Sequence, residues 1–140
     1  MRSSVGALPL AIASALSLLC HCSLGPSASE KAEAGLITRA IDVLRDAPNS
    51  QKAALLDELK AKACAVPDLC ELQRVCVEGY GQHVGALSET ERAKGLLAQG
   101  GDASEASRAL DYARSELVEA APKIAHCADI EGAARRKYKP

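Results

Sequence analysis

The fold is decided by residues 67–102, which read PDLCELQRVCVEGYGQHVGALSETERAKGLLAQGGD. Apolar residues recur every three or four positions in this stretch, and that spacing places them on one side of a helix. They are Leu69, Leu72, Cys76, Tyr80, Val84 and Leu87. Gly100 and Gly101 predict a turn after this helix, and Asp102 with Glu105 predicts the capped start of another. The stretch therefore predicts one half of a helical hairpin.

Two shorter helices are expected before this stretch, over residues 30–47 and 51–63, separated by Pro48. The third helix either continues to Gln99 or breaks near Gly85, because Ser88 and Glu91 resemble a second capping box. In the fourth, Pro122 is expected to kink or interrupt the helix. No stretch shows the alternation of a strand. The fold class is therefore all-α: a small antiparallel bundle of three to four helices.

The turn and the start of the fourth helix carry one resemblance. Gly101-Asp102 followed by Ala106, Leu110 and Ala113 is similar to the second half of a tetratricopeptide repeat over about 25 residues. The resemblance implies two helices paired through small alanines. The first half of the repeat departs from the pattern and no second copy follows, so the stretch is interpreted as a generic helical hairpin.

Residues 1–29 have the pattern of a secretory signal peptide. Arg2 is the only charged residue before Glu30, residues 5–19 are largely apolar, and small residues follow at 25–29. Cleavage after Ser29 is expected. The alternative is a lipoprotein signal in which Cys20 or Cys22 is lipidated. Either interpretation places the product in an oxidising, extracytoplasmic space, secreted or periplasmic in the first case and lipid-anchored in the second.

The expected mature chain, with a helical domain over residues 30–134, contains four cysteines: Cys64, Cys70, Cys76 and Cys127. An even number in an exported domain predicts disulfides. Four cysteines allow three pairings. In an antiparallel hairpin that turns at Gly100, Cys127 lies level with about Gln73, within one turn of both Cys70 and Cys76. Cys76 lies on the apolar stripe that faces the next helix, and Cys64 lies beside the start of the third helix, so the pairs Cys64–Cys70 and Cys76–Cys127 are favoured. The alternative is an extracytoplasmic metal site formed by Cys70, Cys76, His126 and Cys127, although the two Cys-x5-Cys spacings differ from those of zinc sites.

No constellation of an enzyme is present, and no cofactor is expected. His83 is expected to be a packing or surface residue, and no serine lies in a nucleophile elbow. The pair Gly79 and Gly81 beside Tyr80 indicates either close helix packing or a local bend. The composition has three tyrosines and neither Phe nor Trp, which weakens binding modes that need aromatic platforms.

Residues 135–140 form a basic tail, with Arg135, Arg136, Lys137 and Lys139 as candidates for contact with an anionic surface. The rest of the charge is balanced, so nucleic acid is not an expected partner, and membrane contact is expected only after lipidation. The sequence thus predicts an exported, non-enzymatic interaction or structural module. Its partner would be an unspecified protein or envelope component.

Overall fold

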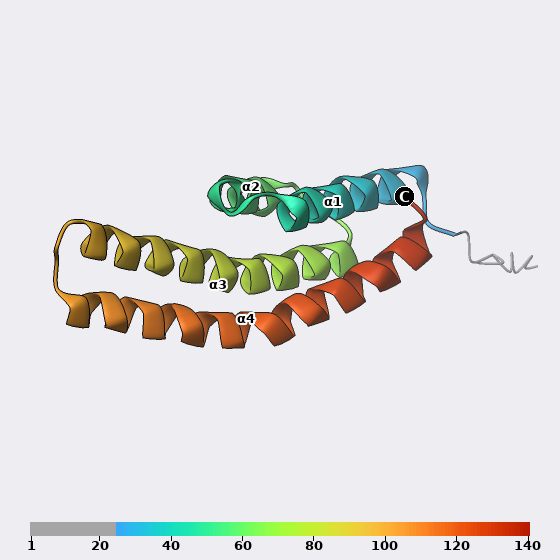
Figure 1. Ribbon diagram of the computed structural model, residues 1–140. Helices are drawn as coiled ribbons and strands as arrows, with labels where there is room; N and C mark the ends of the chain where they lie inside the picture. The colour runs from blue at the N-terminus through green and yellow to red at the C-terminus, as the bar shows by residue number, and fades with distance from the viewer. Residues whose placement is uncertain (1–24) are drawn as a thin grey trace, which may run out of the picture.

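The computed structural model describes residues 25–140 as a bundle of four helices, with no strand in that range. They are α1 (Ala28–Asp46), α2 (Asn49–Ala61), α3 (Pro67–Ala98) and α4 (Ala103–Tyr138). The long helices α3 and α4 form an antiparallel hairpin, and the short pair α1 and α2 lies against one side of it (Figure 1). The predicted all-α bundle is confirmed. Within the described residues, no helix combines the length and the apolar character that crossing a membrane requires.

Helix α1 begins earlier than the sequence indicated. The Ser27 hydroxyl accepts from the Glu30 amide at 3.2 Å, and the Ser27 amide donates to the Glu30 carboxylate at 2.6 Å. This capping box satisfies two backbone donors at the helix start. The cleavage expected after Ser29 would therefore remove the cap and the first residues of α1. Residues 1–24, which include Cys20, Cys22 and most of the expected signal, lie outside the described part of the chain.

A side chain caps the start of α4 but not the start of α3. The Asp102 carboxylate accepts from the Ser104 amide at 2.8 Å and caps α4, as expected. The third helix, α3, does not break near Gly85 but is continuous from Pro67 to Ala98. Its N-cap is Val66 rather than a polar residue, and Pro67 at the first helical position supplies the favourable φ angle.

Helix α4 passes through Pro122 without ending, and its two halves run in different directions (Figure 1). The missing N–H and the ring of a proline inside a helix explain this kink. Just after it, the backbone of α4 approaches Gly79 of α3. A Cβ atom at Gly79 would lie 3.0 Å from the Ile124 nitrogen. Close packing is therefore the reason for glycine at position 79, and α3 has no break at Tyr80.

The main core lies where all four helices meet. It contains large apolar side chains that are fully buried, listed by helix as Ile37, Ile41 and Leu44; Leu59; Leu69 and Leu72; and Tyr138. The other end of the hairpin, residues 86–120, is here named the distal arm. Its interior consists of alanines, with Ala93, Ala106 and Ala109 forming a separate small cluster. The alanine-paired hairpin expected from residues 101–113 is thus present.

The last helix extends past Ala134, after which the basic tail was expected to begin. Helix α4 continues to Tyr138, whose side chain is only 1% exposed and whose hydroxyl donates to the Asp68 carboxylate at 2.7 Å. Lys137 pairs with the same carboxylate at 2.6 Å. Both interactions join residues that are about 70 positions apart, so no local sequence pattern could predict them. The last turn of α4 is part of the core, and only the final two residues lie beyond the helix.

Candidate interaction surface

Both disulfides have the pairing that the sequence favoured. Cys64, in the loop before α3, bonds to Cys70 in its first turns, with 5.4 Å between the Cα atoms. Cys76 of α3 bonds to Cys127 of α4, with 4.9 Å between the Cα atoms. The second bond is fully buried, whereas both sulfurs of the first belong to half-buried residues. Two disulfides in one small domain are typical of proteins from oxidising, extracytoplasmic compartments.

The alternative metal site does not form in this arrangement. Its three cysteines, Cys70, Cys76 and Cys127, all take part in disulfides, and Cys70 bonds to Cys64 rather than to either of the others. Metal binding by cysteine requires the thiolate, which a disulfide removes. His126, the fourth expected ligand, is an exposed residue of α4.

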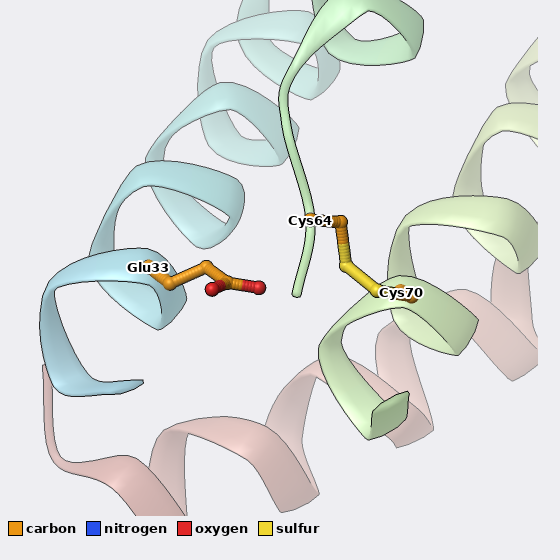
Figure 2. Close-up of side chains that lie close together, drawn as sticks. All are labelled: Glu33, Cys64 and Cys70. Carbon is orange, nitrogen blue, oxygen red and sulfur yellow. A yellow bond between two sulfur atoms is a disulfide. The ribbon is translucent and has the colours of Figure 1, made fainter. Parts of the chain in front are cut away.

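Glu33 is a residue that the sequence did not single out. It projects from α1 toward the loop that carries Cys64 (Figure 2). One carboxylate oxygen accepts from the amides of Ala65 and Val66, at 2.8 Å and 3.0 Å. Its carboxylate lies close to both sulfurs, since one ligand atom from each of Glu33, Cys64 and Cys70 falls within 4.8 Å of the others. Glu33 therefore ties α1 to the disulfide-bonded start of α3.

The basic residues near the C-terminus are divided between internal and external roles. Arg135 bonds to Glu131 and to Asp42 of α1, each at 2.6 Å, so its charge holds α4 against α1. Lys137 lowers the pKa of Asp68 by hydrogen bonding to it, with a second contribution from the Tyr138 hydroxyl. All four predicted basic residues are exposed, but two of them, Arg135 and Lys137, are engaged in these ion pairs, which leaves Arg136 and Lys139 as the other half of the cluster.

Arg135 is held against the bundle partly because its partner, Glu131, is a buried carboxylate. The side chain of Glu131 is only 5% exposed, and it bonds to Arg45 of α1 as well as to Arg135. Nearby, the buried ammonium of Lys52 donates to the carbonyl oxygens of Leu44 and Arg45 at 2.9 Å and 2.8 Å. These oxygens belong to the last turn of α1, which a cation stabilises. The cluster fixes the position of α1 on the hairpin.

His83 lies half-buried on α3, close enough to Lys52 for the lysine charge to affect its pKa. Burial, and then the Lys52 charge, lower the pKa of this imidazole. Among residues 25–140, no hydrogen bond connects His83 to a hydroxyl or thiol nucleophile.

A groove lies where α2 begins and the distal arm leaves the main core. Its volume is about 460 Å³. The apolar part of its lining comes from Ala53, Val84 and Leu87, and the polar part from Asn49, Ser50, Ser88 and Glu91. On α3, the apolar stripe that α1 and α2 cover includes Tyr80 and Val84. It continues along the helix to Leu87, which lines the groove. The groove is therefore the uncovered continuation of the internal helix interface.

The corresponding face of α4 carries exposed leucines. Leu110 and Leu117, each 44% exposed, are spaced by about two helical turns and lie on one side of the helix. Arg135, which contacts α1, follows Leu117 by about five turns, so both lie on the same side apart from the kink at Pro122. In Figure 1 the distal arm extends beyond α1 and α2. The groove and these two leucines together are here named the open face.

Comparison with known proteins gives no relative. The chain matches no protein family, no curated protein and no solved structure. The partial likeness of residues 101–113 to a tetratricopeptide repeat is therefore a likeness of packing, an alanine-paired hairpin.

Proposed function

We propose that this chain is an exported, non-enzymatic interaction module that binds an amphipathic helix of a partner protein on its open face. The observation that carries the proposal is the continuity of this face with the site of α2. Helix α2 has 13 residues and packs Leu56 and Leu59 into the main core. The groove begins at the first residues of α2 and prolongs the same apolar stripe of α3. A second helix placed end to end with α2 would bury Leu87, Leu110 and Leu117.

The polar rim supports a protein partner rather than a lipid surface. Glu91 and Ser88 border the groove, and both are exposed. An anionic side chain beside an apolar groove disfavours anionic lipid head groups and suits the mixed rim of a helix-binding groove. The exposed leucines are few, which fits a module that stays monomeric until it meets its partner.

A photocrosslinking experiment tests the proposal in cells that naturally produce the protein. A photoreactive amino acid is placed at Leu87 or Leu117 on the open face, and at Ser115 on α4 as a matched control. We expect one partner to be crosslinked from both open-face positions and not from Ser115. The crosslinked peptide should have helical periodicity, and Leu110→Glu should release it. Equal crosslinking from Ser115, or no protein adduct, would contradict the proposal, and adducts between two copies of the chain would replace it with self-association.

We also propose that the chain is exported with its N-terminal segment either removed or lipidated at Cys20 or Cys22. The capping box at Ser27 supports a cut that leaves Ser27 in the mature protein. The intact mass of the natively exported protein distinguishes these outcomes, because acyl chains add a defined mass. A mature chain that starts at Glu30 would show that α1 forms without its cap.

A further inference from the structure

The two disulfides differ in a way that the interaction proposal does not use. Cys76 and Cys127 are 0% and 1% exposed. Cys64 and Cys70 are half-buried, in a loop and at a helix start. A reductant in solution therefore has access to the Cys64–Cys70 disulfide and not to the Cys76–Cys127 disulfide. The chain therefore contains one protected disulfide and one accessible disulfide.

Glu33 gives the accessible pair a third metal-ligating group. Figure 2 shows its carboxylate directed toward the disulfide-bonded loop, and the three ligand atoms lie within 4.8 Å of one another. In a tetrahedral zinc site with bonds of about 2.0–2.3 Å, neighbouring ligand atoms are roughly 3.5 Å apart. Small movements therefore suffice: the two sulfurs separate once their bond is broken, and the carboxylate moves closer.

The carboxylate is also oriented in advance. One oxygen of Glu33 is held by the amides of Ala65 and Val66, which belong to the same loop as Cys64. The other oxygen makes no hydrogen bond within the described residues. Hydrogen bonds of this kind fix the orientation of a ligating carboxylate and are typical around zinc.

We propose that Cys64, Cys70 and Glu33 form a zinc site when the Cys64–Cys70 disulfide is reduced. A dithiol reductant supplies the two electrons and two protons: it becomes a cyclic disulfide, and the two cysteines become thiols. A zinc ion then displaces the two thiol protons, which pass to solvent. Two thiolates, one carboxylate and one water complete four ligands. The site is new, since it uses neither His126 nor the buried cysteine pair.

The test uses the full chain carrying Cys20→Ser and Cys22→Ser, so that only the cysteines of the two disulfides remain. It is reduced under native conditions with a dithiol that is then removed without oxygen. Mass after thiol alkylation should show two modified cysteines, and Co²⁺ added in place of zinc should bind one to one. We expect thiolate-to-cobalt absorption that appears only after reduction and disappears in Cys64→Ser/Cys70→Ser. Glu33→Gln should weaken zinc at least tenfold. Glu71→Gln removes an exposed carboxylate next to Cys70 and should leave affinity unchanged.

Several outcomes would overturn this inference. One is the absence of cobalt absorption in a protein that has two free thiols and a helical spectrum. Another is equal zinc affinity in Glu33→Gln and Glu71→Gln, which would remove Glu33 from the site. Resistance of both disulfides to a native dithiol would show that the pair is not accessible. None of these results bears on the open face, whose crosslinking uses the oxidised protein.

Discussion

The substitution Gly81→Ala should stabilise the protein and Gly79→Ala should not, although both residues lie in the same turn of α3. Alanine is favoured over glycine inside a helix by about 1 kcal/mol, so this gain is common to both variants. A Cβ at Gly81 meets no atom within 4 Å. Gly81→Ala should therefore stabilise the protein by up to about 1 kcal/mol.

At Gly79 the same methyl group meets backbone. It would lie 3.0 Å from the Ile124 nitrogen and 3.1 Å from the Lys123 carbonyl carbon, shorter than ordinary contact. The helices cannot easily separate to relieve this, because the Cys76–Cys127 disulfide joins them one turn away. Overpacking of a close contact costs about 1–3 kcal/mol. Gly79→Ala should thus be about 1–3 kcal/mol less stable than Gly81→Ala.

Urea unfolding followed by far-UV circular dichroism measures both free energies, with equal slopes expected for the two variants. Comparison of the two alanines removes the helix-propensity contribution, so their difference reports the contact alone. Repeating the pair in a Cys76→Ala/Cys127→Ala background should shrink the difference by at least about 0.5 kcal/mol, because the helices are then free to move apart. Equal stability of the two variants in the disulfide-bonded protein would refute the reasoning.

Three further outcomes follow from the same structure. Cys76→Ala/Cys127→Ala removes a disulfide between residues 51 positions apart, and Cys64→Ala/Cys70→Ala removes one between residues 6 positions apart. Loop entropy predicts that the free energy of unfolding falls by about 4 kcal/mol in the first variant and about 2 kcal/mol in the second. Urea unfolding measures both losses, and the reverse order would contradict the prediction. Tyr138→Phe removes the hydroxyl donated to Asp68 and should cost about 1 kcal/mol in the same assay, whereas no loss would mean that solvent replaces this bond. Acid should destabilise the fold in two steps, because folding lowers both pKa values concerned. The His83 contribution is complete above its ordinary value of 6.5 and declines as pH falls below it, and that of Asp68 declines below its ordinary value of 3.8. His83→Gln should abolish the upper step in a pH series of urea midpoints, and a step that persists would assign it to another group.

Helix positions could be predicted because they depend on short-range patterns, and the predicted hairpin then favoured one disulfide pairing over the other two. Pro48, Gly100 and Asp102 mark the helix ends, and two helices that turn at Gly100 place Cys76 and Cys127 at similar heights. Cys64 lies at the end of the second predicted helix, beside the start of the third, which favoured its pairing with Cys70. Spacing alone left three pairings open.

The last turn of α4 and the Glu33 contacts could not be predicted in this way. Tyr138 is buried because Asp68, 70 positions earlier, accepts its hydroxyl, and a pattern of Arg, Lys and Tyr at a chain end gives no sign of that. Glu33 contacts backbone amides, which every residue but proline has, so its role leaves no trace in composition.

The alanine interior of the distal arm makes its length independent of the rest of the protein. The ends of α3 and α4 at the turn extend beyond α1 and α2 (Figure 1), and the cluster around Ala93, Ala106 and Ala109 is separate from the main core. Seven residues added to α3 and seven to α4 would move the turn outward by about 10 Å while preserving the faces of both helices. The core and both disulfides would stay as they are. The hairpin is in this sense a spacer, whose reach evolution or design can adjust without refolding the body.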